Sequence, residues 1–66
     1  MSLTLRQARL LSDLTQKQVA DLLGVHTHTY MKWERNPEEM TIRTAKEISK
    51  IFKVDLEEIF FKVESN

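Results

Sequence analysis

The sequence predicts an all-α fold, with one compact five-helix domain formed by residues 1–66. Three observations support this class. The chain holds one glycine and one proline, so the turns that join β-strands are scarce. Its apolar residues recur three and four positions apart, which is the spacing of a helix with one buried face. Two segments, Thr15–Gln18 and Asp55–Glu58, carry the residue pattern of a capping box at a helix start.

The composition is that of a folded domain without cross-links. Hydrophobic residues make up 41% of the chain and charged residues 30%, which is typical of a globular protein and not of a disordered one. There is no cysteine, which excludes disulfides and thiolate metal sites. No run approaches the roughly 20 apolar residues of a membrane span, and no secretory signal precedes the domain. We therefore expect a cytoplasmic protein with no membrane partner.

The first helix is expected near residues 4–12 and the second near 16–23. The second begins after Thr15, whose hydroxyl can accept a hydrogen bond from the amide of Gln18 while the Gln18 side chain reaches back. Gly24 follows this helix, at the position where a left-handed residue commonly closes one.

The third helix is expected near residues 27–35, with His26 as its cap. Tyr30 and Trp33 lie three positions apart on one stripe, which suits a core, while the opposite face is polar and cationic. Only two residues separate this helix from Gly24. Two helices joined by so tight a turn must cross at a large angle, which is the helix-turn-helix arrangement.

The last two helices are expected near residues 42–53 and 56–61. Pro37 interrupts the helical pattern before the fourth helix, and Asp55 is the expected cap of the fifth.

Charge is distributed unevenly along a chain whose net charge is zero. Residues 1–36 hold five basic and three acidic side chains, a net +2, whereas residues 37–66 hold five basic and seven acidic ones, a net −2. This asymmetry hints at an anionic partner for the first half.

The two histidines do not predict a metal site. Residues two apart on a helix point about 200° apart, so His26 and His28 are not expected to share an ion. No further histidine or cysteine exists to complete a coordination shell. A small helical domain also leaves little room for a catalytic cleft. We therefore expect no metal, no cofactor and no catalytic residue, and a protein that is not an enzyme.

Residues 14–36 read LTQKQVADLLGVHTHTYMKWERN and resemble the helix-turn-helix of the lambda-repressor/Cro-like family, also called the xenobiotic-response-element family. With Gln16 as the first position of the motif, Ala20 is its small fifth residue and Gly24 its ninth, the turn glycine. The five apolar positions of the motif are occupied by Val19, Leu23, Val25, Tyr30 and Trp33.

Residues 40–60 read MTIRTAKEISKIFKVDLEEIF and resemble the fourth and fifth helices of the same family, so the resemblance covers roughly residues 5 to 60. It implies the lambda-repressor-like five-helix fold. It also implies a sequence-specific transcriptional regulator, a repressor in a bacterium or phage, with the helix at about 27–35 in the major groove of double-stranded DNA. We expect no separate sensor domain and no small-molecule effector.

The resemblance implies a phosphate contact at the start of the second helix. Gln16 would bond a DNA phosphate there, with Thr15 and Lys17 beside it. The alternative is that these are ordinary surface residues of a first helical turn. Arg9 and Glu34 match a family pair that is structural, an ion pair between the first and third helices.

Base edges would be read from the third helix, according to the resemblance, by Thr27, His28 and Lys32. Met31 lies beside them and could touch a thymine methyl group, and His26 could add a contact of its own. The alternative is a solvated helix face with no binding role.

The chain departs from the family pattern at three places, one of them Lys46, where an apolar residue is usual. Lys53 replaces the glycine that usually follows the fourth helix, so either Lys53 takes a positive φ at some cost or the end of this helix differs. Glu38 and Glu39 follow the third helix, where carboxylates would repel phosphate, and a neutral chain makes few phosphate contacts. These acids favour the alternative function, a protein-interaction module of the same fold, such as an anti-repressor or an antitoxin-like partner.

The end of the chain carries more apolar surface than one helix face can bury. We expect Phe61 or Val63 to contribute to a symmetric homodimer, which would bind a pseudo-palindromic operator. The alternative is that Phe61 folds back onto its own domain.

Overall fold

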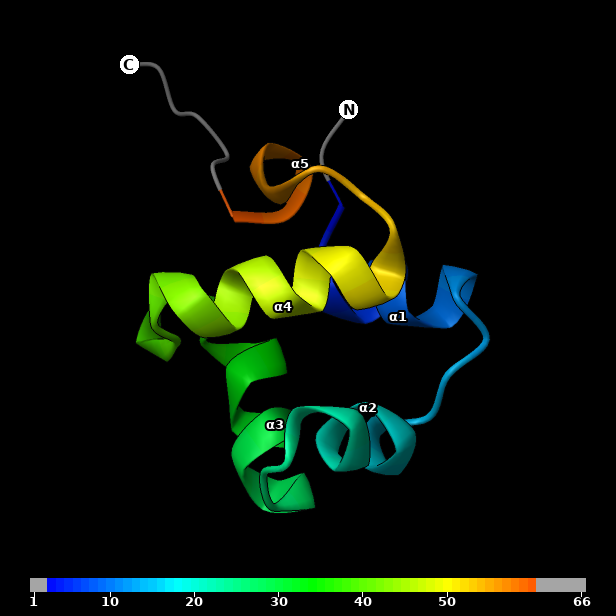
Figure 1. Cartoon of the computed structure of the whole chain (residues 1–66), viewed down its shortest axis with the longest axis vertical. Coiled ribbons are helices and arrows are strands. Elements are labelled where there is room, and N and C mark those ends of the chain that lie inside the picture. The colour runs from blue at the N-terminus through cyan, green and yellow to red at the C-terminus, as the bar shows by residue number, and fades with distance from the viewer. Residues whose placement is uncertain (1–2, 61–66) are drawn as a thin grey trace.

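The computed structural model describes residues 3–60 and confirms the all-α, five-helix class. Within these residues α4 lies between the α2–α3 pair on one side and α5 on the other, with α1 beside it (Figure 1). Each helix lies within one or two residues of its expected position, and a short 3-10 turn, η1, was not predicted. The elements are α1 (Leu5–Leu11), α2 (Gln16–Leu23), α3 (Thr27–Arg35), η1 (Pro37–Glu39), α4 (Ile42–Phe52) and α5 (Leu56–Phe60).

Capping boxes begin the first two helices. At α2 the Thr15 hydroxyl accepts from the Gln18 amide at 3.0 Å, and the Thr15 amide donates to Oε1 of Gln18 at 2.9 Å, as predicted. At α1 the same pair of bonds joins Thr4 and Gln7, at 3.0 and 2.9 Å. This second box has the same Thr-x-x-Gln spacing, so the sequence signal was present and was missed.

Within residues 3–60, three residues in the left-handed region lie at the ends of helices or turns. Gly24 closes α2 with φ 73°, as predicted. Lys53 closes α4 with φ 57°. A lysine therefore adopts the positive φ that glycine usually provides at this position. Asp13, with φ 58°, follows α1, and aspartate tolerates this region better than most residues. At α5 the amide of Glu58 bonds the backbone carbonyl of Asp55 at 3.0 Å.

The core draws on all five helices. Tyr30 of α3 is a fully buried member of this core, and Trp33 is partly buried against the core, so the aromatic stripe of α3 faces inward as predicted. Within residues 3–60 the buried apolar side chains of this cluster are Leu5, Ala8, Val19, Ala20, Tyr30, Ile48, Phe52 and Ile59, and Ala45 of α4 is buried as well.

A backbone bond ties the start of the described chain to α5. The amide of Leu3 donates to the carbonyl of Glu58 at 2.8 Å. Phe61 and Val63, the two residues expected at a dimer interface, lie outside the described residues.

No helix within residues 3–60 has the length and hydropathy needed to cross a membrane.

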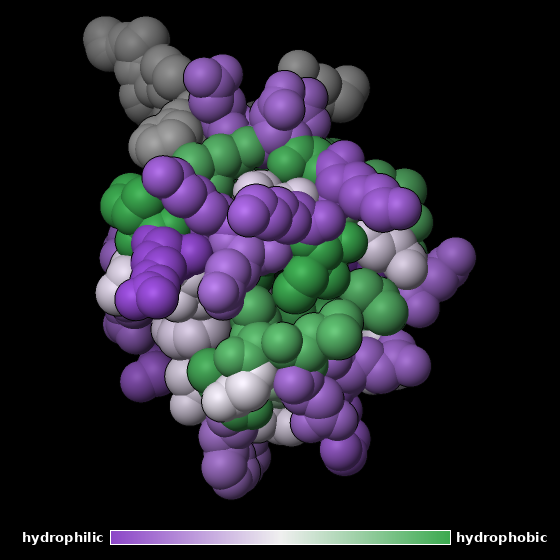
Figure 2. Space-filling model, viewed as in Figure 1, coloured by the Kyte–Doolittle hydropathy of each residue, from purple (hydrophilic) through white to green (hydrophobic). Residues whose placement is uncertain are grey.

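Apolar side chains also remain exposed on α1, α2 and α4. Figure 2 shows a band of apolar surface on the side of α4 that faces α2 and α3. An open hollow of about 330 Å³ is lined by Leu14, Leu22 and two polar residues, Gln18 and Asp21. These two offer no pairing of a nucleophile with a base. Among the residues that the structure describes, the exposed large apolar ones are Leu10, Leu11, Leu22 and Ile42.

Candidate nucleic-acid interface

A tight turn holds α3 across α2. The Val25 amide donates to the Ala20 carbonyl at 3.0 Å, and the Gly24 amide to the Asp21 carbonyl at 3.2 Å. Ala20 has no exposed surface, and α2 and α3 pack closely against each other. The turn and the close approach leave one face of α3 directed away from the domain (Figure 1).

That outer face carries the polar side chains that the sequence singled out. His26, His28 and Lys32 are exposed, and Thr27 and Met31 are half-buried. Because Tyr30 on the same helix is fully buried, α3 presents an apolar side to the core and a polar side to solvent. This arrangement can offer hydrogen-bond donors and acceptors together with a positive charge to a ligand surface.

The two histidines stack on each other, and the prediction that they point in opposite directions was wrong. Their ring centroids are 5.8 Å apart with an interplanar angle of 25°. His26 precedes the helix in an extended conformation, φ −68° and ψ 145°, so helical spacing does not apply to it. Its side chain makes no capping bond. Within residues 3–60 no group of three or more His, Cys, Asp or Glu is placed to hold a metal.

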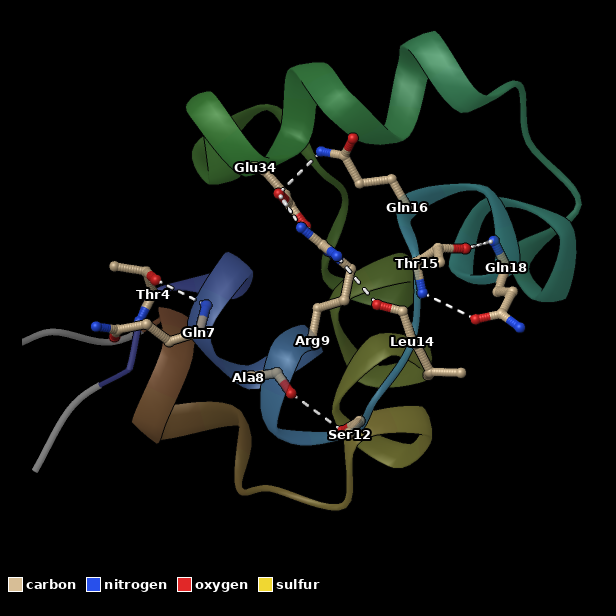
Figure 3. A network of polar contacts seen from close by, with 10 residues as sticks. All are labelled: Thr4, Gln7, Ala8, Arg9, Ser12, Leu14, Thr15, Gln16, Gln18 and Glu34. Carbon is tan, nitrogen blue, oxygen red and sulfur yellow. Dashed lines mark hydrogen bonds and ion pairs between the residues drawn. The ribbon is translucent and has the colours of Figure 1, made fainter.

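The start of α2 lies beside α3, and its side chains already have partners. Lys17 Nζ is 3.1 Å from Oδ2 of Asp21 one turn later, with both side chains exposed. The Thr15 hydroxyl accepts the capping-box hydrogen bond from the Gln18 backbone amide. The amide nitrogen of Gln16 donates to Oε1 of Glu34 at 3.0 Å (Figure 3). The sequence did not predict this contact, since no local pattern links residues 18 positions apart.

Arg9 and Glu34 form a buried ion pair between α1 and α3. Nε of Arg9 is 2.6 Å from Oε2 of Glu34, and a second guanidinium nitrogen is 3.4 Å from Oε1. Nη1 of Arg9 also donates to the Leu14 carbonyl at 3.0 Å. The two side chains are 9% and 6% exposed, so the pair is shielded from solvent on both sides.

This pair sets the ionisation of its surroundings. Burial alone would raise the pKa of Glu34, but hydrogen bonds, above all from Arg9, hold this pKa below its usual value. The same bond raises the pKa of Arg9. Burial raises the pKa of Tyr30, whose hydroxyl lies near the pair and makes no hydrogen bond of standard geometry with the described residues. Glu34 is therefore an anion with a fixed cationic partner.

The acidic turn η1 reaches the outer face of α3. Oε1 of Glu39 is 3.9 Å from Nζ of Lys32, and the two side chains are 48% and 54% exposed. The two acids after the third helix predicted repulsion of an anionic ligand, whereas no sequence pattern predicted that Glu39 would pair with Lys32. One of the cations on the outer face is thus partly neutralised in the free protein.

Comparisons with known proteins agree with this geometry. The family model described as "Helix-turn-helix" matches residues 5–59. A Vibrio cholerae protein described as the cryptic phage CTXphi transcriptional repressor RstR is 29% identical over 62 residues. The alignment covers 94% of this chain and 56% of the phage protein, so the chain spans little more than half of that relative's length. No solved structure gives a significant match.

Proposed function

This chain belongs to the helix-turn-helix family, and we propose that it represses transcription by binding double-stranded DNA with α3 in the major groove. Its family makes it a DNA-binding regulator of the Cro/C1 type and not an enzyme. The observation that carries the proposal is the two-sided character of α3, with Tyr30 fully buried and Lys32 exposed on the opposite side. A repressor role is supported by the similarity to the phage protein described as a transcriptional repressor.

Phosphate contacts are proposed at the start of α2. Gln16 and the unpaired amides of the first helical turn would bond one phosphate, with Lys17 and Thr15 beside them. A helix N-terminus favours an anion because its free N–H groups point toward the anion and the positive end of the helix dipole lies there. These contacts would set the register of α3 and would carry no sequence information.

Base contacts are proposed for the outer face of α3. Thr27, His28 and Lys32 would reach base edges, where a lysine favours guanine and hydroxyl or imidazole groups bond either donors or acceptors. Met31 would contact a thymine methyl group. His26, stacked on His28, would restrict where that ring can lie.

A homodimer is proposed as the binding unit. A two-fold pair would place its α3 helices in successive major grooves, about 34 Å apart, and would require a pseudo-palindromic operator. Phe61 and Val63 are proposed for its interface. Two half-sites would also supply the contact area that one module of this size lacks.

The test is selection of bound fragments from random duplex DNA, followed by titration of the best fragment at two salt concentrations. We expect a palindromic winner. Lys32→Ala should weaken binding about tenfold, the value of one good base contact. Lys50→Ala removes the same charge from an exposed position on α4 and is the control, with a smaller loss. No enriched fragment, or equal losses in both variants, would contradict the proposal.

A second candidate is a protein-interaction module of the same fold, such as an anti-repressor. The pairing of Lys32 with Glu39 and the zero net charge favour it, because both reduce attraction to phosphate. It predicts that no duplex is enriched in the selection. The two candidates thus give opposite results in one experiment.

A further inference from the structure

We propose that Glu34 is a positioning residue for DNA binding, because it fixes the amide of Gln16 so that one N–H of that amide faces a DNA phosphate. The inference rests on the proposed function of α2 and α3. It assigns to Glu34 a role beyond the ion pair with Arg9.

The orientation of Gln16 follows from the chemistry of its partner. An ionised carboxylate only accepts hydrogen bonds, so it must be met by the amide nitrogen of Gln16 and not by the amide oxygen. The nitrogen lies 3.0 Å from Oε1 of Glu34, and the oxygen points away from it (Figure 3). An amide nitrogen has two hydrogens, and Glu34 takes one. The second stays available to another acceptor, at the helix start where a phosphate would lie.

Glu34 can hold Gln16 because Glu34 is itself held. Arg9 bonds both of its oxygens, at 2.6 and 3.4 Å, and Arg9 is anchored in turn on the Leu14 carbonyl at 3.0 Å. The contacts therefore run without interruption from α1 through α3 to the first residue of α2. Since the Glu34 side chain is only 6% exposed, its alternative positions are few.

Arg9 also removes the main objection to a carboxylate close to DNA. An unpaired Glu34 would repel phosphate, but the guanidinium balances its charge at hydrogen-bond distance. A phosphate would then contact the outward N–H of the Gln16 side-chain amide and not an unbalanced carboxylate. If Gln16 were free, its amide could turn the oxygen outward, and that orientation repels an anion. Fixing the amide before binding removes this loss of affinity.

Glu34→Asp is the change that separates orientation from ion pairing. Aspartate keeps the negative charge for Arg9, but its carboxylate is one methylene further from Gln16. A double-mutant cycle with Gln16→Met, which removes the amide and keeps similar bulk, isolates the coupling between the two positions. The measured quantity is the affinity for the duplex selected from random DNA.

We expect Glu34→Asp to weaken DNA binding about tenfold when residue 16 is glutamine, the lower end of the loss for one hydrogen bond to a charged group, and to have almost no effect beside Gln16→Met. Equal losses in both backgrounds would reduce Glu34 to a structural role and overturn the inference. If Glu34→Asp does not fold, Glu34→Gln replaces it in the cycle. A glutamine at position 34 can both donate and accept, so the amide nitrogen of Gln16 is no longer required to face residue 34.

Two further measurements respond to orientation and not to stability. In the free protein, one Gln16 side-chain N–H signal should show hydrogen bonding to a carboxylate in NMR spectra, and Glu34→Asp should abolish that signature. A duplex with one neutral methylphosphonate at the contacted phosphate should lose more affinity for the wild type than for Gln16→Met, because the backbone amides of α2 and Lys17 keep their contacts in both proteins. If the wild type binds DNA but no methylphosphonate position distinguishes it from Gln16→Met, the role of Glu34 is overturned and the proposed function stands. If the wild type binds no duplex, the proposed function itself is overturned.

Discussion

Lys32 on α3 and Glu39 on η1 face each other at 3.9 Å, on the edge of the surface proposed to read DNA. The acidic turn η1 follows α3 directly in the chain, so the Glu39 carboxylate lies beside α3 with no other helix between them. In the free protein Lys32 has a counter-ion within the molecule. A DNA ligand would have to replace it.

Glu39→Gln should therefore strengthen DNA binding, by about threefold at low salt, since an exposed ion pair of this kind is worth under 1 kcal/mol. Glu38→Gln is the matched control, because it removes the same charge from the neighbouring exposed residue. The gain from Glu39→Gln should exceed that of the control, and added salt should shrink it. Identical gains for both would mean that only the net charge of the turn matters.

The ion pair of Arg9 and Glu34 predicts a pH dependence of stability. The pKa of Glu34 is lowered in the folded protein, while in the unfolded chain it is near 4.5. The stabilisation is thus complete above about pH 4.5 and is lost as the pH falls below that value, toward the folded pKa. Glu34→Gln should be less stable than the wild type at pH 7, and the difference should narrow on acidification.

Urea unfolding at pH 7 and at several lower pH values measures this difference. Glu47→Gln changes the same charge at an exposed position on α4 and should follow the wild type. A difference between wild type and Glu34→Gln that stays constant below pH 4.5 would show that Glu34 is not ionised against Arg9.

Lys53→Gly should stabilise the domain. Lys53 holds φ 57°, a conformation that costs a side chain roughly 1 kcal/mol and costs glycine nothing comparable. Lys50→Gly, three residues earlier and inside α4, should instead lose about 1 kcal/mol of unfolding free energy. Thermal unfolding distinguishes the two, and a loss in both variants would refute the left-handed helix end.

The Tyr30 hydroxyl is buried without a hydrogen bond of standard geometry among the described residues. Tyr30→Phe should therefore change the unfolding free energy by no more than about 0.5 kcal/mol, because no bond is lost. Tyr30→Ala should lose about 3 to 5 kcal/mol through the cavity that it leaves. If Tyr30→Phe alone loses more than about 1 kcal/mol, the hydroxyl contributes to the network of Arg9 and Glu34.

Local rules were enough to predict the fold class and which side of α3 is buried. The capping box at Thr15 and the glycine at Gly24 act within a few residues of chain, so their geometry can be read from sequence and was confirmed. The buried side of α3 followed from helical spacing in the same way, with Tyr30 at the centre of the core.

The side-chain contacts between different elements of the candidate site could not be predicted from local sequence patterns. Gln16 meets Glu34 only because α2 and α3 cross, and Glu39 meets Lys32 only because η1 folds back beside α3. Neither pairing follows from spacing along one helix. The stacking of His26 on His28 was missed for a related reason, since a residue just before a helix does not follow the periodicity of the helix.

The bond from the Leu3 amide to the Glu58 carbonyl has a consequence for folding kinetics. It joins positions 55 residues apart, whereas the turn between α2 and α3 closes over a handful of residues. Closing the longer loop costs more chain entropy, so this bond should form after the helix-turn-helix is in place. Hydrogen exchange at the Leu3 amide would then report when α5 has docked, and its protection would mark the completion of the domain.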